Sequence, residues 1–104
     1  DPEWCGGVSE LVKICAIASV HGVHVIPHGH SIHAAMHVVA SQSPDVCPLV
    51  EYLIGKMDGN YYHFEKNAPR AVNGKLTLPD RPGFGIELDS SNINKREIIT
   101  WRDL

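Results

Sequence analysis

The sequence predicts an α/β fold in which short parallel strands alternate with helices. Helix-like and strand-like patterns follow one another through the first half of the 104-residue chain, separated only by short loops. This alternation is typical of parallel α/β units. Two strands and two helices alone would leave sheet edges open and apolar faces uncovered. We therefore expect the chain to be a fragment of a longer polypeptide that supplies further strands.

The first predicted element is a helix over residues 6–22. Apolar side chains recur on one face with a period of 3.6 residues: Leu11, Ile14, Cys15 and Ala18. We expect Ser9 to cap the beginning of this helix and Gly22 to end it.

A short β-branched run at 23–27 follows and predicts a buried strand that ends at Pro27. Residues 28–31 then form a loop. A second helix is predicted over 31–42, with Ser31 as its N-cap and Pro44 beyond its end. Its apolar face consists of Ile32, Ala35, Met36 and Val39.

The apolar run at 48–55 predicts another strand, and the alternation stops after it. Asn73-Gly74 is a typical tight-turn pair. Residues 79–85 form a loop rich in proline and glycine, and residues 86–88 are expected to form a short strand. The second half therefore does not extend the α/β unit.

Composition restricts the possible functions. The net charge is −3 and no basic block is present, so we expect neither a nucleic-acid partner nor a membrane partner. No apolar stretch is long enough to span a bilayer. The three cysteines match no disulfide or zinc framework, which favours free thiols and a cytoplasmic location.

Several motifs occur together in one order: "DPEWCGG", "HGVHVIPHG", "SP", "VEYL" and "VNGKLTLPDRPGFGIEL". With these motifs the chain resembles the C-terminal part of the enolase superfamily. It is most similar to the mandelate-racemase-like subgroup, and within it to acid-sugar dehydratases of the L-rhamnonate dehydratase type. The resemblance implies a modified TIM barrel with an α+β capping domain. Residues 1–66 would hold the last barrel strands and helices, and residues 67–104 would return to the capping domain.

The resemblance also implies three catalytic residues. Asp1 matches an Asp that ends the sixth strand, His28 a His that ends the seventh, and Glu51 a Glu that ends the eighth. In the family the Asp and the His form a hydrogen-bonded dyad, so we expect Asp1 to contact His28. Side chains at these strand ends point into the active site, where a His base suits removal of the proton next to a carboxylate.

The implied activity is a Mg²⁺-dependent dehydration of a sugar acid, a carbon–oxygen lyase reaction. The family's metal ligands end earlier strands, so we assign no metal ligand within this sequence and expect the fragment alone to be inactive. His30 and His33 follow the catalytic position and are candidates for binding substrate hydroxyls. The expected partners are the sugar acid, the rest of the barrel and the capping domain, in a homo-oligomer.

Two alternatives stay open at this point. A racemase or epimerase of the same superfamily would share the first proton abstraction and differ in a second acid outside this sequence. A non-catalytic, His-rich metal-binding module would instead use His30, His33 and His37 as zinc ligands.

Overall fold

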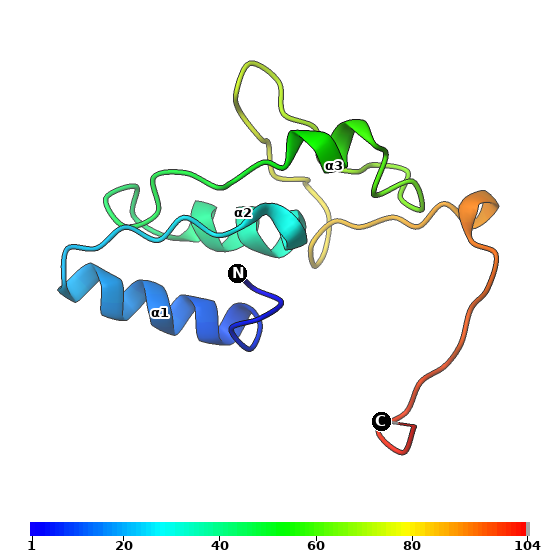
Figure 1. Cartoon of the computed structure of the whole chain (residues 1–104), viewed down its shortest axis with the longest axis horizontal. Helices are drawn as coiled ribbons and strands as arrows, with labels where there is room; N and C mark the ends of the chain where they lie inside the picture. The colour runs from blue at the N-terminus through cyan, green and yellow to red at the C-terminus, as the bar shows by residue number, and fades with distance from the viewer. Residues whose placement is uncertain (104) are drawn as a thin grey trace.

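The computed structural model describes residues 1–103 (Figure 1). Three α-helices and two short 3₁₀ turns follow one another along the chain. They are α1 (Val8–Val20), a 3₁₀ turn (Gly29–Ser31), α2 (Ile32–Ser41), α3 (Ile54–Asp58) and a second 3₁₀ turn (Ser90–Asn92). Extended segments and loops connect them.

Helix α1 is the predicted first helix with shorter ends. Its N-cap is Gly7, so the prediction of Ser9 as the cap was wrong. Gly7 has φ +90°, a left-handed conformation that glycine adopts readily, and it lets the chain turn into the helix two residues earlier.

The predicted end at Gly22 is confirmed. Gly22 has φ +63°, and its N–H donates to the carbonyl of Ser19 at 3.3 Å, while the N–H of Val23 donates to the carbonyl of Ala18 at 3.0 Å. This pair of bonds is a Schellman motif, which satisfies carbonyls that the last helical turn leaves free.

Helix α2 begins where the sequence predicts. Ser31 occupies the N-cap position, although its side chain makes no capping hydrogen bond. Ile32, Ala35 and Met36 of the predicted apolar face are buried, and Val39 is half-buried. The short 3₁₀ turn lengthens this helix at its N-terminal end and places it directly after His28.

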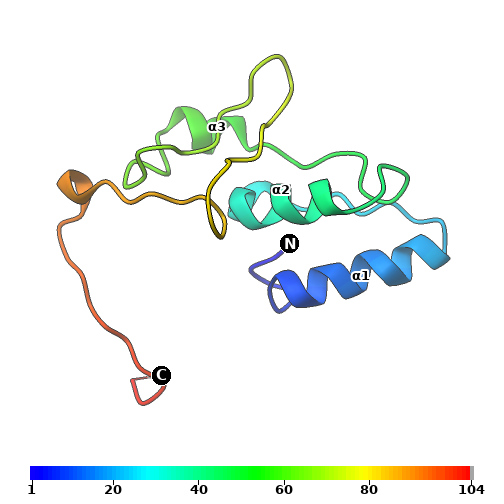
Figure 2. The ribbon, with the colours of Figure 1, turned by 180° about the vertical axis from the view of Figure 1, so that it is seen from behind.

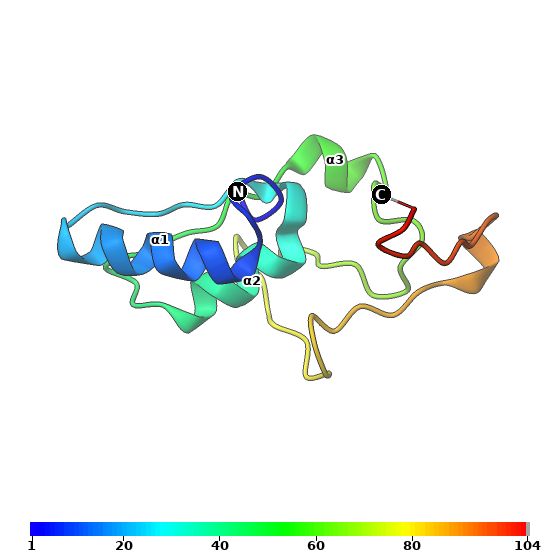
Figure 3. The same cartoon turned by 90° about the horizontal axis from the view of Figure 1, so that it is seen from below.

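Two extended segments, at 22–28 and 45–53, run in the same direction beside these helices (Figure 1). The N–H of Val25 donates to the carbonyl of Val46 at 2.8 Å, and the N–H of Glu51 donates to the carbonyl of Pro27 at 3.1 Å. Helices α1 and α2 contact each other and run opposite to both segments (Figures 1 and 3). This arrangement is the helix-and-strand packing of a parallel α/β unit.

The strands predicted at 23–27 and 48–55 do not form as regular strands within residues 1–103. Pro27 and Pro48 have no N–H to donate, so the hydrogen-bond ladder between the two segments is interrupted. The last part of the second prediction is also wrong, because Ile54 begins helix α3.

The first of two buried clusters joins α1, α2 and the beginning of the second extended segment. It contains Leu11, Cys15, Ala18, Val38, Val46 and Cys47. The sulfur atoms of Cys15 and Cys47 lie 3.5 Å apart as free thiols, and burial raises the pKa of Cys47 to about 11. This cluster fixes how the two extended segments lie on the helices.

The second cluster connects the start of α2 to the second half of the chain. Its buried members are Ile32, Met57 and Tyr62, with Phe64 and Leu76 packed against them. Residues that follow the second extended segment therefore pack close to the loop that precedes α2.

The predicted Asn73-Gly74 turn is confirmed. Both residues have positive φ, +50° and +72°, and Val72 and Lys75 exchange two backbone hydrogen bonds across them. The predicted strand at 86–88 is reduced to one antiparallel bridge between Glu65 and Leu88. Beyond it the chain leads away from the helices toward its C-terminal end, as the view from behind shows (Figure 2).

No helix within residues 1–103 combines the length and the apolar character needed to cross a bilayer.

Candidate active site

The candidate site lies where the two extended segments end. His28 is the last residue of the first segment and Glu51 lies near the end of the second. Because the segments are parallel and are joined by the bond from Glu51 N to Pro27 O, their C-terminal ends meet at one edge. The structure therefore brings together two of the three predicted catalytic residues.

Nδ1 of His28 is in hydrogen-bond contact with Oε2 of Glu51. The N–H of Gly29 lies 3.3 Å from the same carboxylate oxygen and 3.1 Å from Nδ1. The 3.1 Å approach of the Gly29 N–H to Nδ1 is a hydrogen bond only when Nδ1 carries no proton and Glu51 does. An ionised carboxylate only accepts hydrogen bonds, so with Glu51 ionised both Nδ1–H and the Gly29 N–H donate to its Oε2. That tautomer leaves a lone pair on Nε2 of His28, and both side chains are partly open to solvent.

Gly29 permits this close approach. A Cβ atom at this position would collide with the backbone of Glu51, including its carbonyl carbon at 3.1 Å, and with Cγ of Leu53 at 3.2 Å. The lack of a side chain at Gly29 thus lets the loop after His28 lie directly against the segment that carries Glu51.

Asp1 does not form the predicted hydrogen bond with His28. Its backbone carbonyl accepts bonds from the N–H groups of Trp4 and Cys5, at 3.1 and 3.0 Å, which hold the first turn. Within residues 1–103 its Oδ1 is buried and has no hydrogen-bond partner. Nδ1 of His28 instead contacts Oε2 of Glu51.

The two candidate substrate-binding histidines lie in different environments. His30 is half-buried, and its ring centroid is 4.5 Å from that of His28. His33 is only 8% exposed, and its Nε2 lies 2.8 Å from Oε2 of Glu65. His30 therefore borders the candidate site directly, while His33 faces a buried carboxylate.

No group of three or more His, Cys, Asp or Glu side chains in the described part of the chain could hold a metal ion. The three histidines of the zinc-module alternative contact different groups. His33 faces Glu65, and Nδ1 of His37 lies 2.7 Å from the carbonyl of His33.

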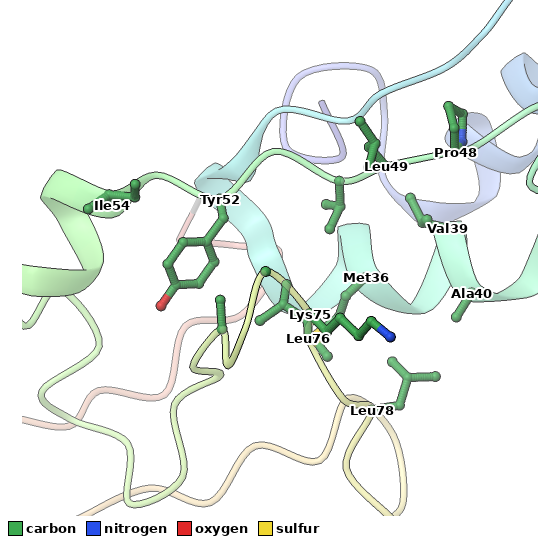
Figure 4. Close-up of a pocket in the computed structure, with 13 residues that line it drawn as sticks. Met36, Val39, Ala40, Pro48, Leu49, Tyr52, Ile54, Lys75, Leu76 and Leu78 are labelled. Atoms are coloured by element: carbon green, nitrogen blue, oxygen red, sulfur yellow. The ribbon is translucent and has the colours of Figure 1, made fainter.

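An apolar hollow of about 670 Å³ lies apart from these residues, between α2, the second extended segment and the 72–75 turn (Figure 4). Aliphatic side chains such as Met36, Leu49 and Leu76 form most of its wall. None of Asp1, His28 and Glu51 borders it, so it lacks the acid–base groups of the candidate site.

Comparisons with known proteins place this geometry in a family. The model of the enolase C-terminal domain-like family matches residues 1–92. The chain belongs to the enolase C-terminal domain-like family. Its α/β unit is that of the enolase superfamily.

Individual enolase-superfamily relatives support the same assignment. The chain is 35% identical to an L-rhamnonate dehydratase of Saccharopolyspora erythraea, over 86% of this chain and 23% of the relative. It is 37% identical to a D-galactarolactone cycloisomerase of Agrobacterium fabrum, over 82% of this chain and 25% of the relative. The chain thus spans about a quarter of the length of these proteins.

A solved enolase-superfamily structure agrees with the fold. A crystal structure described as a mandelate racemase/muconate lactonizing enzyme superposes with a TM-score of 0.70 at 31% identity, covering 88% of this chain and 24% of that chain. Similarity to the mandelate-racemase-like subgroup is therefore seen in both sequence and structure.

Sequence reasoning missed two residues beside the candidate site, Tyr62 and Glu65. Both are buried next to the His28–Ser31 loop. Burial raises the pKa of Glu65, and the neighbouring His33 partly opposes this rise. The 56–72 stretch has no clear period, so only the presence of a carboxylate among aromatic residues could have drawn attention to Glu65.

Proposed function

We propose that this chain is the C-terminal part of a dehydratase that acts on a sugar acid, with His28 as the base. The observation that supports this proposal most directly is the contact between Nδ1 of His28 and the Glu51 carboxylate, which leaves Nε2 available on the open side. An imidazole held in one tautomer by a carboxylate suits proton transfer near neutral pH.

In the proposed reaction, Nε2 of His28 takes the proton from the carbon next to the substrate carboxylate. The electron pair of that bond forms an enediolate. The β-hydroxyl then leaves as water after receiving a proton, and the resulting enol becomes a 2-keto-3-deoxy acid. One substrate therefore gives one keto acid and one water, with no net oxidation.

Asp1 and Glu51 have complementary parts in the proposal. The buried Oδ1 of Asp1 lacks a donor within the described residues, and a buried oxygen without one is costly. We propose that in the complete protein the His28 ring turns its Nδ1–H to Asp1. Glu51 is then free to donate or share a proton with the enediolate oxygen.

His30 is the better placed of the two substrate-binding candidates, because its ring adjoins that of His28. We propose that it contacts a substrate hydroxyl. His33 keeps this role only as a sequence prediction, since it is buried against Glu65.

The proposal includes Mg²⁺, which would stabilise the negative charge of an enediolate. The described residues do not form a ligand set, so its ligands would belong to segments outside this sequence. None of the steps assigned to His28, Asp1 and Glu51 above is routed through the metal.

The proposed setting is a TIM barrel. The extended segments carry an apolar surface that is uncovered, with Ile26 51% exposed. We propose that it faces the barrel interior, that residues 1–66 complete the barrel, and that residues 67–104 return to a capping domain. A homo-oligomer in the cytoplasm completes the proposal.

A racemase or epimerase is the second candidate, because it begins with the same proton abstraction. The two reactions are separated by incubating the full-length protein and Mg²⁺ with a panel of sugar acids in D₂O. Formation of a 2-keto-3-deoxy acid supports the dehydratase. Exchange of the α-hydrogen without loss of water supports the racemase, and neither change with any sugar acid would contradict both.

A further inference from the structure

The loop that carries His28 and His30 is held from one side by residues 62–65. The hydroxyl of Tyr62 donates to the backbone carbonyl of His30 at 2.5 Å. Three residues after His30, in helix α2, Nε2 of His33 lies 2.8 Å from Oε2 of Glu65. Two side chains from one short segment thus reach two successive points of the loop and the start of α2.

These contacts are shielded from water. Tyr62 is packed in a cluster with Ile32 and Met57, and only 2% of the Glu65 side chain is exposed. The His33 ring meets the Tyr62 ring edge-on, with centroids 5.0 Å apart. His33 and Glu65 are at ion-pair distance, although the direction of approach does not complete a hydrogen bond between Nε2 and Oε2.

The holding segment is itself fixed at both ends. The N–H of Glu65 donates to the carbonyl of Tyr62 at 2.9 Å, which closes the turn. The N–H of Lys66 then donates to the carbonyl of Glu87 at 2.9 Å, and the N–H of Asp89 donates to the carbonyl of Phe64 at 2.7 Å. Residues 87–89 therefore hold the turn through two backbone hydrogen bonds.

A buried polar pair of this kind contributes little net stability compared with apolar residues of similar size, but it can fix one geometry. The geometry that this pair would fix is that of the neighbouring site, which contains His28 and His30. The His28 and His30 rings are 4.5 Å apart, so a shift of the His30 backbone moves the base as well.

We infer that Tyr62 and Glu65 are positioning residues that hold the His28–His30 loop in place through the His30 carbonyl and His33. The expected fall in kcat on loss of these contacts rests on the proposed function. The expected loosening of the His28–His30 loop does not. Displacement of a base by a fraction of an ångström lowers kcat much more than it changes substrate binding.

The first test compares Tyr62→Phe with Tyr61→Phe in the full-length protein. Each variant removes one phenolic hydroxyl, but Tyr61 is half exposed and lies outside the contact to the loop. We expect Tyr62→Phe to raise hydrogen–deuterium exchange in a peptide covering 28–33 by about tenfold, the factor expected for loss of one hydrogen bond. We expect kcat to fall by roughly ten- to a hundredfold, with KM within about twofold.

The second test uses Glu65→Ala, with Glu65→Gln as the conservative rescue and Glu97→Ala, at an exposed glutamate that pairs with Lys95, as the control. Glutamine keeps an acceptor toward His33, so it should restore most of the slow exchange that alanine loses. If Tyr62→Phe does not fold, the comparison of Glu65→Ala with Glu65→Gln still tests whether this segment holds the loop in place.

Equal exchange at 28–33 in Tyr62→Phe and Tyr61→Phe, or no rescue of Glu65→Ala by glutamine, would overturn the inference. If the full-length protein turns over no sugar acid, the proposed function fails, and the exchange comparison still decides the positioning role.

Discussion

Nδ1 of His28 contacts Oε2 of Glu51, although 23 residues separate the two in the chain. The contact follows from two parallel segments that end at the same edge, joined by the bond from Glu51 N to Pro27 O. Its chemical effect is to fix which ring nitrogen carries the proton. The neighbouring Gly29 N–H adds a second donor to the same carboxylate oxygen, at 3.3 Å.

The base assignment predicts different outcomes for two substitutions in the full-length protein. His28→Asn removes the proton acceptor, so exchange of the substrate α-proton should fall to background while the fold is kept. Asp1→Asn leaves the base in place, but it should still slow exchange by about 10²-fold or more, as loss of an orienting carboxylate does elsewhere. Proton NMR in D₂O measures both rates, and wild-type exchange in His28→Asn would refute the assignment.

The carboxylate contact makes Glu51→Gln a separate test. In the complete protein we propose that Asp1 holds the Nδ1–H, so the amide chiefly removes the acid that would donate or share a proton with the enediolate oxygen. We expect kcat to fall by about 10- to 100-fold at unchanged stability. Glu97→Gln is the matched control because it neutralises an exposed carboxylate that pairs with Lys95. Equal kcat values for the two variants would argue against a role for Glu51.

Gly29→Ala should damage the site through sterics alone. The added Cβ meets the Glu51 backbone and Leu53, so the loop or the second segment must move. Overpacking of this kind costs about 1–3 kcal/mol. Gly55→Ala is the control, since a Cβ there meets nothing within 4 Å inside helix α3. Urea denaturation should show Gly29→Ala destabilised and Gly55→Ala at least as stable as wild type.

Features that depend on local chain chemistry were predictable from the sequence. The period of Leu11, Cys15 and Ala18 identified α1, and Asn73-Gly74 identified a turn with two positive φ values. That His28 and Glu51 share one edge was also predictable, because residues at the ends of parallel strands lie at one edge. Their direct contact was not predicted, since the expected partner of His28 was Asp1.

Features that depend on distant partners were not predictable in the same way. The extended segments were identified, but Pro27 and Pro48 interrupt the pairing between them, so no regular strand forms within residues 1–103. The contacts of Tyr62 and Glu65 arise from a stretch without periodicity. Their sequence separation from the His28–Ser31 loop gives no local signal of burial.

The last prediction concerns the pH dependence of stability at Glu65. Burial raises the pKa of this carboxyl above its ordinary value of 4.5, with the His33 ring as the opposing group and the Tyr62 hydroxyl as a further titratable neighbour. The folded state therefore binds this proton more tightly than the unfolded state. Its stabilising contribution is present below pH 4.5 and is lost as the pH rises through the folded-state pKa. Relative to Glu65→Gln, wild type should lose stability as the pH rises above 4.5.

Glu87 supplies a control of opposite sign. Hydrogen bonds and charge interactions with Lys66 and Arg81 lower the pKa of this partly exposed carboxyl to about 2, so its contribution is present above pH 4.5 and is lost as the pH falls toward 2. Chemical denaturation from pH 3 to 8 should therefore give opposite slopes for wild type relative to Glu65→Gln and to Glu87→Gln. In about 1 M salt the Glu87 difference should shrink, because exposed charges are screened within about 3 Å, while the buried Glu65 difference should persist. A Glu65→Gln difference that does not change with pH would show that this carboxyl titrates alike in the folded and unfolded states.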